Sequence, residues 1–334
     1  MSWNSYFSAA NDLVRKLDSS GNSLWAYTNY TAEVLCVAVD KDGNVYTGSN
    51  DDVLLKLDSS GNLIWTYNTP QAVNEVEVDH EGYIYAAIDD GDIHKIDSTG
   101  QLVWKHSLPF PHEPVGVTVD NVGNVYSVDD DSNVTKIHSD GSQIWVNSSH
   151  TSTPRDVAVD FRGNVYTASD DMTYKKINRF GTVLWTYTGH TSYATSIDVD
   201  LDGNVYTANY DNTAHKLDSS GNFIWSYTGH TNNVMSVTVD PDGNVYTASY
   251  DDGVSKIDSS GSQIWYYRQY GFDSTTRNAL DVSVDPGKSG TGSWFDGHLG
   301  YKDTIATADN FFDRQLYGVE ISVSEEMSVY GLGF

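Results

Sequence analysis

The chain has 334 residues, 39% of them hydrophobic and 13% aromatic, which is enough for one large domain or two ordinary ones with a sizeable core. Its 46 acidic and 19 basic residues give a formal net charge of −27, which excludes a general nucleic-acid binder and argues against docking on anionic lipid. A single cysteine, Cys36, excludes an internal disulfide.

Three short strands are predicted at the start of the chain, over residues 6–10, 14–18 and 23–27. Each is a run with strand propensity, and turns rich in Asp, Ser and Gly separate the runs. The third strand contains Trp25. No strand pattern precedes the first of them, so this group is one strand short of the units that follow.

A repeat of about 40 residues runs through most of the chain. Its tryptophans are Trp25, Trp65, Trp104, Trp145, Trp185, Trp225 and Trp265. The glycines of an Asp-x-x-Gly turn share the period and are Gly43, Gly82, Gly123, Gly163, Gly203 and Gly243. Because two independent residue types follow one period of this length, the pattern indicates a solenoid or a propeller.

The unit at 229–268 shows what each repeat contains. Residues 234–240 alternate between apolar and polar, and three further strands are predicted at 245–249, 254–258 and 262–266. Pro, Asp, Gly and Asn at 241–244 form a tight turn between the first two strands. Four short antiparallel strands in each period, with no helical periodicity, are typical of a propeller blade.

Six complete units end at Trp265, and a lone first strand follows at 280–285. With the three strands at the start of the chain it makes a seventh blade from the two chain ends, which removes the free sheet edges. The predicted fold is therefore all-β, a seven-bladed β-propeller of four-stranded antiparallel blades over residues 1–285, with a C-terminal extension over 286–334. The alternative is an eight-bladed propeller whose last unit begins near residue 303.

Two signatures in the repeat resemble known propeller families. Gly-His-Thr at 229–231, followed by Asp-Pro-Asp-Gly at 240–243 and Ala-Ser-Tyr-Asp-Asp at 248–252, is similar to a WD-repeat, although the Trp-Asp dipeptide is absent. Lys-Ile-Asp-Ser-Ser-Gly at 256–261, followed by Trp265, resembles the PQQ-like repeat, in which a tryptophan closes the fourth strand. The WD-repeat likeness implies that His190 and His230 belong to a structural hydrogen-bond network. It implies a fold rather than a function.

Candidate metal sites are better explained by the repeat itself. His150, His190 and His230 share one slot, but equivalent positions on successive blades lie around a ring and do not converge on one ion. The Asp-x-Asp-Gly-Asn turns suggest calcium, yet Val122 and Arg162 fill the second acidic slot in two repeats, so hairpin geometry accounts for the motif better. We therefore expect no metal site.

A lysine occupies one slot in every blade, and we interpret it as the partner of the carboxylate two residues on, as in Lys56 and Asp58. The sequence contains no phosphate-binding loop, metalloprotease helix or nucleophile elbow. The PQQ-like resemblance raises the alternative of a quinone-dependent enzyme, but such enzymes often have an adjacent cysteine pair, which one cysteine cannot supply. We expect no catalytic residue and no cofactor.

Candidate partner-binding residues lie where the repeats differ. The first departure is the segment 105–114, and the second is an aromatic run with an arginine, a combination that suits a protein partner or a sugar. The aromatic residues of the C-terminal extension add to this run. The predicted set is Tyr266, Tyr267, Arg268, Tyr270, Phe272, Trp294, Phe295, Phe311, Phe312 and Phe334.

These features favour a non-enzymatic structural or binding propeller. Near-identical repeats, no secretory signal and an aromatic tail resemble propeller proteins of halophilic archaeal tailed viruses, which implies a capsid decoration or tail component displayed on a virion surface. The expected partners are other structural chains, in a homo-oligomer or a larger assembly, and a host-surface glycan or protein. Neither nucleic acid nor membrane is expected. The alternatives are a cytoplasmic scaffold propeller and a quinone-dependent or hydrolytic enzyme.

Overall fold

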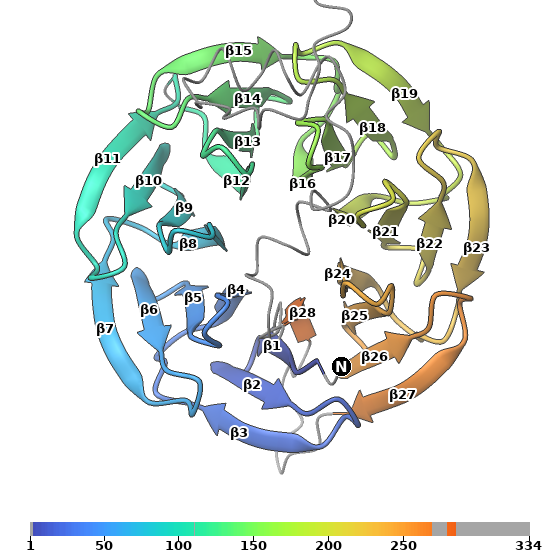
Figure 1. Ribbon diagram of the computed structural model, residues 1–334, viewed down its shortest axis with the longest axis horizontal. Helices are drawn as coiled ribbons and strands as arrows, with labels where there is room; N and C mark the ends of the chain where they lie inside the picture. Colours follow the sequence, from blue (N-terminus) through green and yellow to red (C-terminus); the bar gives the residue numbers. More distant parts are fainter. Residues whose placement is uncertain (1–2, 110, 269–278, 285–334) are drawn as a thin grey trace, which may run out of the picture. The chain divides into compact units, whose positions relative to one another are not determined.

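The computed structural model describes residues 3–109, 111–268 and 279–284. These residues form 28 β-strands in seven four-stranded antiparallel sheets, which stand around a central axis as the blades of a propeller (Figure 1). The predicted fold class is confirmed. The predicted extension at 286–334 and the alternative eighth blade near residue 303 lie outside the described residues. None of the described residues belongs to a helix long and apolar enough to cross a bilayer.

The four strands of each blade are called A to D from the centre outward. Blade 1 consists of β4 (Val34–Val39), β5 (Val45–Ser49), β6 (Val53–Leu57) and β7 (Leu63–Asn68). Blade 2 consists of β8 (Val73–Val78), β9 (Ile84–Ile88), β10 (Asp92–Ile96) and β11 (Leu102–Ser107). Blade 3 consists of β12 (Pro114–Val119), β13 (Val125–Asp129), β14 (Val134–Ile137) and β15 (Gln143–Asn147). Blade 4 consists of β16 (Pro154–Val159), β17 (Val165–Ser169), β18 (Tyr174–Ile177) and β19 (Val183–Tyr187).

The remaining blades follow the same order. Blade 5 consists of β20 (Ala194–Val199), β21 (Val205–Asn209), β22 (Ala214–Leu217) and β23 (Phe223–Tyr227). Blade 6 consists of β24 (Val234–Val239), β25 (Val245–Ser249), β26 (Gly253–Ile257) and β27 (Gln263–Arg268). Blade 7 takes strand A from the far end of the chain and consists of β28 (Ala279–Val284), β1 (Ser5–Ala9), β2 (Leu13–Leu17) and β3 (Ser23–Tyr27).

Blade 7 joins the two ends of the propeller. Strand β28 pairs antiparallel with β1, which places Phe7 opposite Val282 and Ser5 opposite Val284. Phe7 and Val282 are buried, and they share a core with Tyr246 and Val254 of blade 6. The closure predicted from the lone strand at 280–285 is thus confirmed.

The hydrophobic core lies between neighbouring blades. In one cluster, Cys36 and Leu54 of blade 1 pack with Val73 and Ile84 of blade 2, and all four are buried. One tyrosine on each strand B is also fully buried, and the set is Tyr6, Tyr46, Tyr85, Tyr126, Tyr166, Tyr206 and Tyr246. Because each core is shared, the stability of a blade depends on its neighbours.

The turn between strands A and B is held by one carboxylate. In blade 6, Oδ1 of Asp240 accepts the backbone N–H groups of Asp242 and Asn244 at 3.0 and 2.8 Å. Its Oδ2 accepts the side-chain amide of Asn244 at 2.8 Å and the hydroxyl of Tyr246 at 3.1 Å. Gly243 has a φ of 80°, which favours glycine. These bonds explain the repeated Asp-x-x-Gly-Asn-x-Tyr motif as a hairpin.

A tryptophan on each strand D joins its blade to the next one. Nε1 of Trp25 in blade 7 donates to the carbonyl oxygen of Ser59 in blade 1 at 3.1 Å. The ring lies against Gly61, where an added Cβ would approach it to 2.9 Å. All seven tryptophans of the repeat donate in this way, and Trp265 closes the ring on Ser19 at 3.0 Å.

The repeated lysine of strand C lies over a tyrosine and not beside the following aspartate. Nζ of Lys56 is 5.1 Å from the ring centroid of Tyr46 and 3.4 Å from the carbonyl oxygen of Ser98 in blade 2. Asp58 instead accepts N–H groups of its own turn. The predicted pair of Lys56 and Asp58 is wrong because β6 ends at Leu57, so the alternation of the strand does not extend to Asp58.

Candidate functional site

The inner strands of the seven blades surround a central channel (Figure 1). Each strand A pairs on one side only, with strand B, so its other edge faces the axis. The channel contains a cavity of about 700 Å³. Trp3 lies against this cavity, is 5% exposed and donates from Nε1 to Asp242 at 2.6 Å. The repeat pattern did not reveal Trp3 because this residue precedes the first strand.

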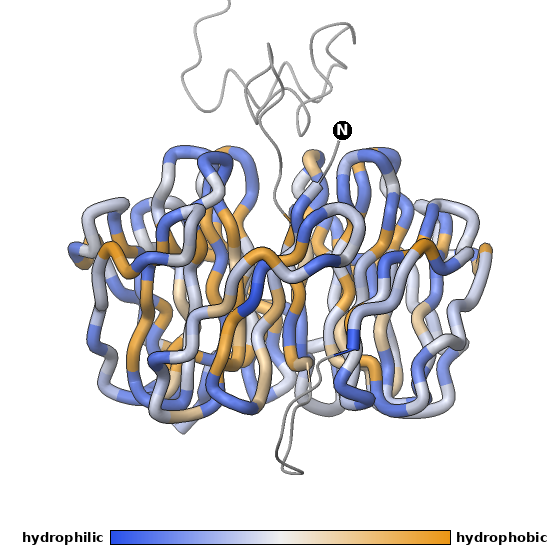
Figure 2. Tube along the Cα trace, turned by 90° about the horizontal axis from the view of Figure 1, so that it is seen from below, coloured by the Kyte–Doolittle hydropathy of each residue, from blue (hydrophilic) through white to orange (hydrophobic). Residues whose placement is uncertain are grey.

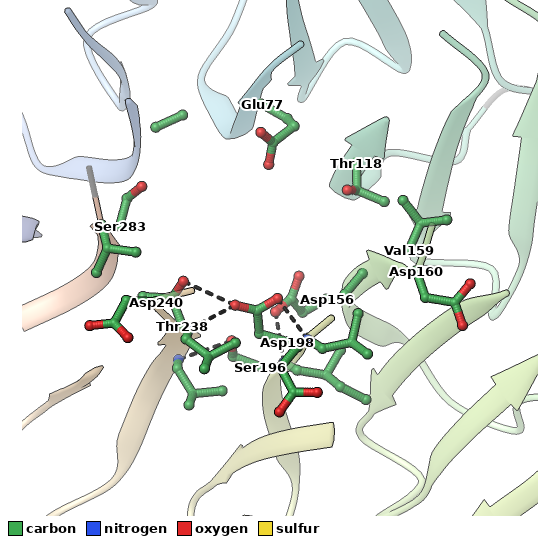
Figure 3. Close-up of a pocket in the computed structure, with 18 of the residues that line it drawn as sticks. Glu77, Thr118, Asp156, Val159, Asp160, Ser196, Asp198, Thr238, Asp240 and Ser283 are labelled. Carbon is green, nitrogen blue, oxygen red and sulfur yellow. Dashed lines mark hydrogen bonds between the residues drawn. The ribbon is translucent and has the colours of Figure 1, made fainter. Parts of the chain in front are cut away.

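Five of the carboxylates in the cavity wall lie on strands A, and they are Glu75, Glu77, Asp156, Asp198 and Asp281. They occupy the third or fifth position of strand A, where other blades have small or hydroxyl side chains. Each is half-buried, because protein surrounds it while one side faces the cavity. Figure 3 shows three of them, from three different blades, directed toward the cavity. Sequence analysis missed these residues because alternation along a strand does not reveal which face borders the axis.

The three aspartates of this set bridge successive blades. Asp198 accepts the N–H of Val199 on its own strand at 2.7 Å and the N–H of Val239 on the next blade at 2.9 Å. Asp156 and Asp281 make equivalent pairs of bonds at 2.6 to 2.9 Å. A free strand edge leaves N–H groups without a sheet partner, and these carboxylates satisfy them.

The two glutamates lie on β8, and among the described residues each accepts a hydrogen bond from its own strand alone. Glu75 and Glu77 accept the N–H groups of Val76 and Val78, both at 3.0 Å. Burial raises the pKa of Glu77 to about 7, with added repulsion from neighbouring carboxylates. Burial also raises the pKa of Asp198 to about 6 against the lowering effect of its hydrogen bonds. The channel is therefore suited to hold protons near neutral pH and to accept hydrogen-bond donors.

The family comparison matches three overlapping segments of the chain, at residues 10–106, 89–201 and 178–291. The matching family is described as outer membrane protein assembly factor BamB and has PQQ-type repeats. Together the segments reach from the turn that follows β1 of blade 7 to β28, which completes that blade. The chain belongs to this family. No curated protein gives a significant match.

Pyrroloquinoline quinone, for which the PQQ-type repeat is named, does not fit the channel of this BamB-type propeller. The quinone is a tricarboxylic acid, so its site must supply cations or free N–H donors. The cavity instead presents carboxylates, and three of these already accept backbone N–H groups from the inner edges of strands A. Among the described residues of the cavity wall, Lys216 is the one lysine, and its Nζ lies 5.0 Å from the ring centroid of Tyr206.

Buried histidines stabilise the B–C corners of three blades in this BamB-type chain. Nδ1 of His230 is 3.0 Å from Asp251, and its Nε2 is 2.8 Å from the hydroxyl of Thr247. Burial alone would raise the pKa of Asp251, but the hydrogen bond and charge of His230 lower it to about 2. His190 makes the same two contacts, and so does His150, despite its preceding serine.

The predicted aromatic run begins on the last strand of blade 6. Tyr266 is 37% exposed and Arg268 is exposed, whereas the ring of Tyr267 packs on Phe7 with centroids 5.8 Å apart. Tyr267 therefore belongs to the joint between blades 6 and 7. Seven other predicted partner residues lie outside the described residues, and they are Tyr270, Phe272, Trp294, Phe295, Phe311, Phe312 and Phe334.

An apolar belt follows the outer edge of the propeller. The residue before each repeat tryptophan is aliphatic and 47–54% exposed, and the seven are Leu24, Ile64, Val103, Ile144, Leu184, Ile224 and Ile264. We call this set the outer belt. In Figure 2 apolar segments recur along the outer strands. The sequence did contain a signal for it, because adjacent apolar residues on strand D must point to opposite faces.

Proposed function

We propose that this chain is a non-enzymatic binding propeller that assembles with protein partners through its outer belt. The belt carries the proposal, because it places a half-exposed aliphatic side chain on strand D of all seven blades. A single exposed apolar residue is ordinary, whereas an exposed aliphatic side chain that recurs at the same position of every blade offers a partner a repeated set of apolar contacts. Strand D also ends each sheet, so its outer N–H and C=O groups can accept an added strand.

The roles of the repeated polar residues support a structural assignment. The channel aspartates accept the N–H groups on the inner edge of strand A. The buried histidines each form a triad with an aspartate and a threonine of their own blade, as His230 does with Asp251 and Thr247. The repeated lysines lie over core tyrosines. Each of these groups thus contributes to holding the blades in place. Other copies of the chain are the partners that we propose, because a belt repeated seven times can form several equivalent contacts.

Charge introduced into the belt tests this proposal. The triple variant Ile64→Lys, Ile144→Lys and Ile224→Lys should abolish the association of the full-length chain in sedimentation velocity at high salt. The matched control replaces exposed apolar residues outside the belt, at Val122, Phe180 and Leu201, by lysine. Association that survives in the belt variant, or is lost equally in the control, would contradict the proposal.

Within this function, we propose that the assembly is the surface of a virion, with residues 286–334 mediating attachment. The strongly acidic composition supports a host environment of high salt, in which a screening length of about 3 Å at 1 M weakens the repulsion. A capsid decoration or a tail component are the two positions that this role allows. The competing assignment is a cellular scaffold propeller, for which no particle is needed.

Fractionation of infected cultures separates these assignments. The chain should sediment with assembled particles and remain there through a density gradient, and deletion of 286–334 should leave a folded propeller in the soluble fraction. Far-ultraviolet circular dichroism of the truncated chain checks its folding. A full-length chain that never sediments with particles would support the cellular scaffold.

A further inference from the structure

Blade 2 departs from the repeat by acquiring charged and imidazole groups on two adjacent strands. Strand β10 carries Asp92 and His94 at the positions where β6 of blade 1 has valine and leucine. Strand β11 carries Lys105 directly opposite His94, where blade 1 has a threonine opposite its leucine. The three substitutions are therefore neighbours in space as well as departures from the repeat.

His94 has a buried ring nitrogen that finds no hydrogen-bond partner among the described residues. The residue is 4% exposed, and its Nδ1 lies 3.0 Å from the hydroxyl of Tyr67. Its Nε2 makes no hydrogen bond within the described part of the chain and lies 3.8 Å from Oδ2 of Asp92. In the tautomer that donates from Nδ1 to Tyr67, the lone pair of Nε2 faces this carboxylate. Leaving such a group unsatisfied destabilises the fold, so a ligand at Nε2 would be favourable.

Blade 5 provides the matched arrangement in which the same histidine is satisfied. His215 occupies the slot of His94, and its Nδ1 lies 2.9 Å from the hydroxyl of Tyr187. Its Nε2 lies 3.3 Å from the hydroxyl of Thr213, which occupies the slot of Asp92. Replacing that hydroxyl by a carboxylate therefore removes the internal hydrogen bond and adds a negative charge beside the free nitrogen.

Asp90 brings a second carboxylate to the same place. In four other blades the aspartate at this corner accepts an N–H from the incoming D–A connection, and these aspartates are Asp51, Asp171, Asp211 and Asp251. The connection from β7 to β8 of blade 2 is two residues shorter than the connection from β3 to β4 of blade 1, and Asp90 accepts the N–H of Asp92 at 3.1 Å. One ligand atom from each of Asp90, Asp92 and His94 lies within 4.8 Å of the others.

Lys105 supplies the positive charge at this cluster. Its Nζ lies 2.6 Å from Oδ2 of Asp92, which is a charge-assisted hydrogen bond. The lysine side chain is 56% exposed, whereas that of Asp92 is 8% exposed. A half-solvated lysine can move into solvent when a bound cation takes over the neutralisation of this buried carboxylate.

We propose that Asp90, Asp92 and His94 form a binding site for a divalent transition-metal ion of the Zn²⁺ class, with the Lys105 ammonium as its stand-in in the metal-free chain. One imidazole nitrogen and two carboxylate oxygens are a ligand set that Zn²⁺ accepts, leaving a fourth position for water. The hydrogen bond of Nδ1 to Tyr67 is the orienting contact that metal-bound histidines require.

The geometry needs only a local adjustment to receive the ion. Ligand atoms at about 2.0–2.2 Å from zinc lie roughly 3.3 Å from one another, so the cluster must close by about 1.5 Å. Rotation of the two carboxylates supplies this once Lys105 withdraws.

Titration of the untagged full-length chain with Co²⁺, followed by displacement with Zn²⁺, tests the proposal. Visible absorption of tetrahedral Co²⁺ should report one site per chain. His94→Leu, which installs the residue of blade 1, should weaken binding by about 100-fold, because the nitrogen ligand is lost. Lys105→Thr should tighten it about tenfold, because the competing cation is gone. The control His215→Leu alters the equivalent slot of blade 5 and should leave the affinity unchanged.

The two opposite effects separate this site from general attraction of cations to an acidic surface. Circular dichroism and metal-free thermal unfolding establish that each variant is folded. A site retained in His94→Leu, binding that is unchanged or weaker in Lys105→Thr, or only the weak spectrum of octahedral Co²⁺ would each overturn the proposal. A tetrahedral spectrum that is lost in the first variant and strengthened in the second would support it.

Discussion

The glycine in the turn between strands C and D combines a positive φ with close contact to the tryptophan of the neighbouring blade. Gly61 has a φ of 85°, and a Cβ there would approach Trp25 to 2.9 Å. Gly82 has a φ of 86°, but its nearest neighbour, in Ser98, would be 3.7 Å away. We expect Gly61→Ala to lower the free energy of unfolding by about 2–3 kcal/mol and Gly82→Ala by about 1 kcal/mol. Denaturant unfolding measures both, and equal losses would mean that the docking of Trp25 contributes nothing.

The channel glutamates give stability an unusual dependence on pH. Glu77 keeps its proton up to a pKa of about 7, whereas a glutamate in the unfolded chain loses it near about 4.3. Between these values the folded chain binds more protons, so this contribution is full below about pH 4 and is lost as the pH rises through 7. Asp198 acts in the same direction, with a pKa of about 6.

Glu77→Gln should therefore raise the free energy of unfolding at pH 8, by on the order of 1–2 kcal/mol, and flatten its decline between pH 5 and pH 8. Thermal unfolding at a series of pH values measures this. The control Glu81→Gln removes an exposed carboxylate from a nearby turn and should leave the slope unchanged. A slope that persists in Glu77→Gln would show that the channel does not hold the proton.

At the scale of elements, the sequence predicted the strands and turns because their signals are local. The alternation in 234–240 and the Pro-Asp-Gly-Asn turn define β24, β25 and the hairpin between them. The partners of individual side chains were harder to predict. Lys56 was assigned to Asp58 and instead lies over Tyr46, because the choice depends on where β6 ends. The channel carboxylates depend on which edge faces the axis, a property of the assembled ring.

The histidine triads are also properties of elements, since each joins a D–A connection to strand B and the B–C corner of one blade. Thr247→Val would leave the buried Nε2 of His230 without its partner at 2.8 Å. We expect a loss of about 1–3 kcal/mol in the free energy of unfolding. Thr66→Val, at an exposed position on strand D, is the matched control and should change it by less than about 0.5 kcal/mol. Equal effects of the two substitutions would argue against a stabilising triad.

For the whole molecule, a net charge of −27 makes repulsion a large term. Added NaCl or KCl should screen it, so the melting temperature should rise by about 10 °C or more between 0.1 and 2 M salt. An uncharged osmolyte at the same osmolality serves as the control, because it does not screen charge. A melting temperature that is flat across the salt series would mean that the acidity does not govern stability.

The channel, the contacts between neighbouring blades and the circular arrangement of the outer belt all depend on closure of the ring by the two chain ends. Ser5 lies opposite Val284 in the pairing of β1 with β28. With Cys36 replaced by alanine, the double variant Ser5→Cys and Val284→Cys should oxidise to an intramolecular disulfide and raise the free energy of unfolding by several kcal/mol. Non-reducing electrophoresis and denaturant unfolding measure these effects. Free thiols or disulfide-linked dimers, as expected for the mismatched pair Ser5→Cys and Thr66→Cys, would contradict a ring closed by its own ends.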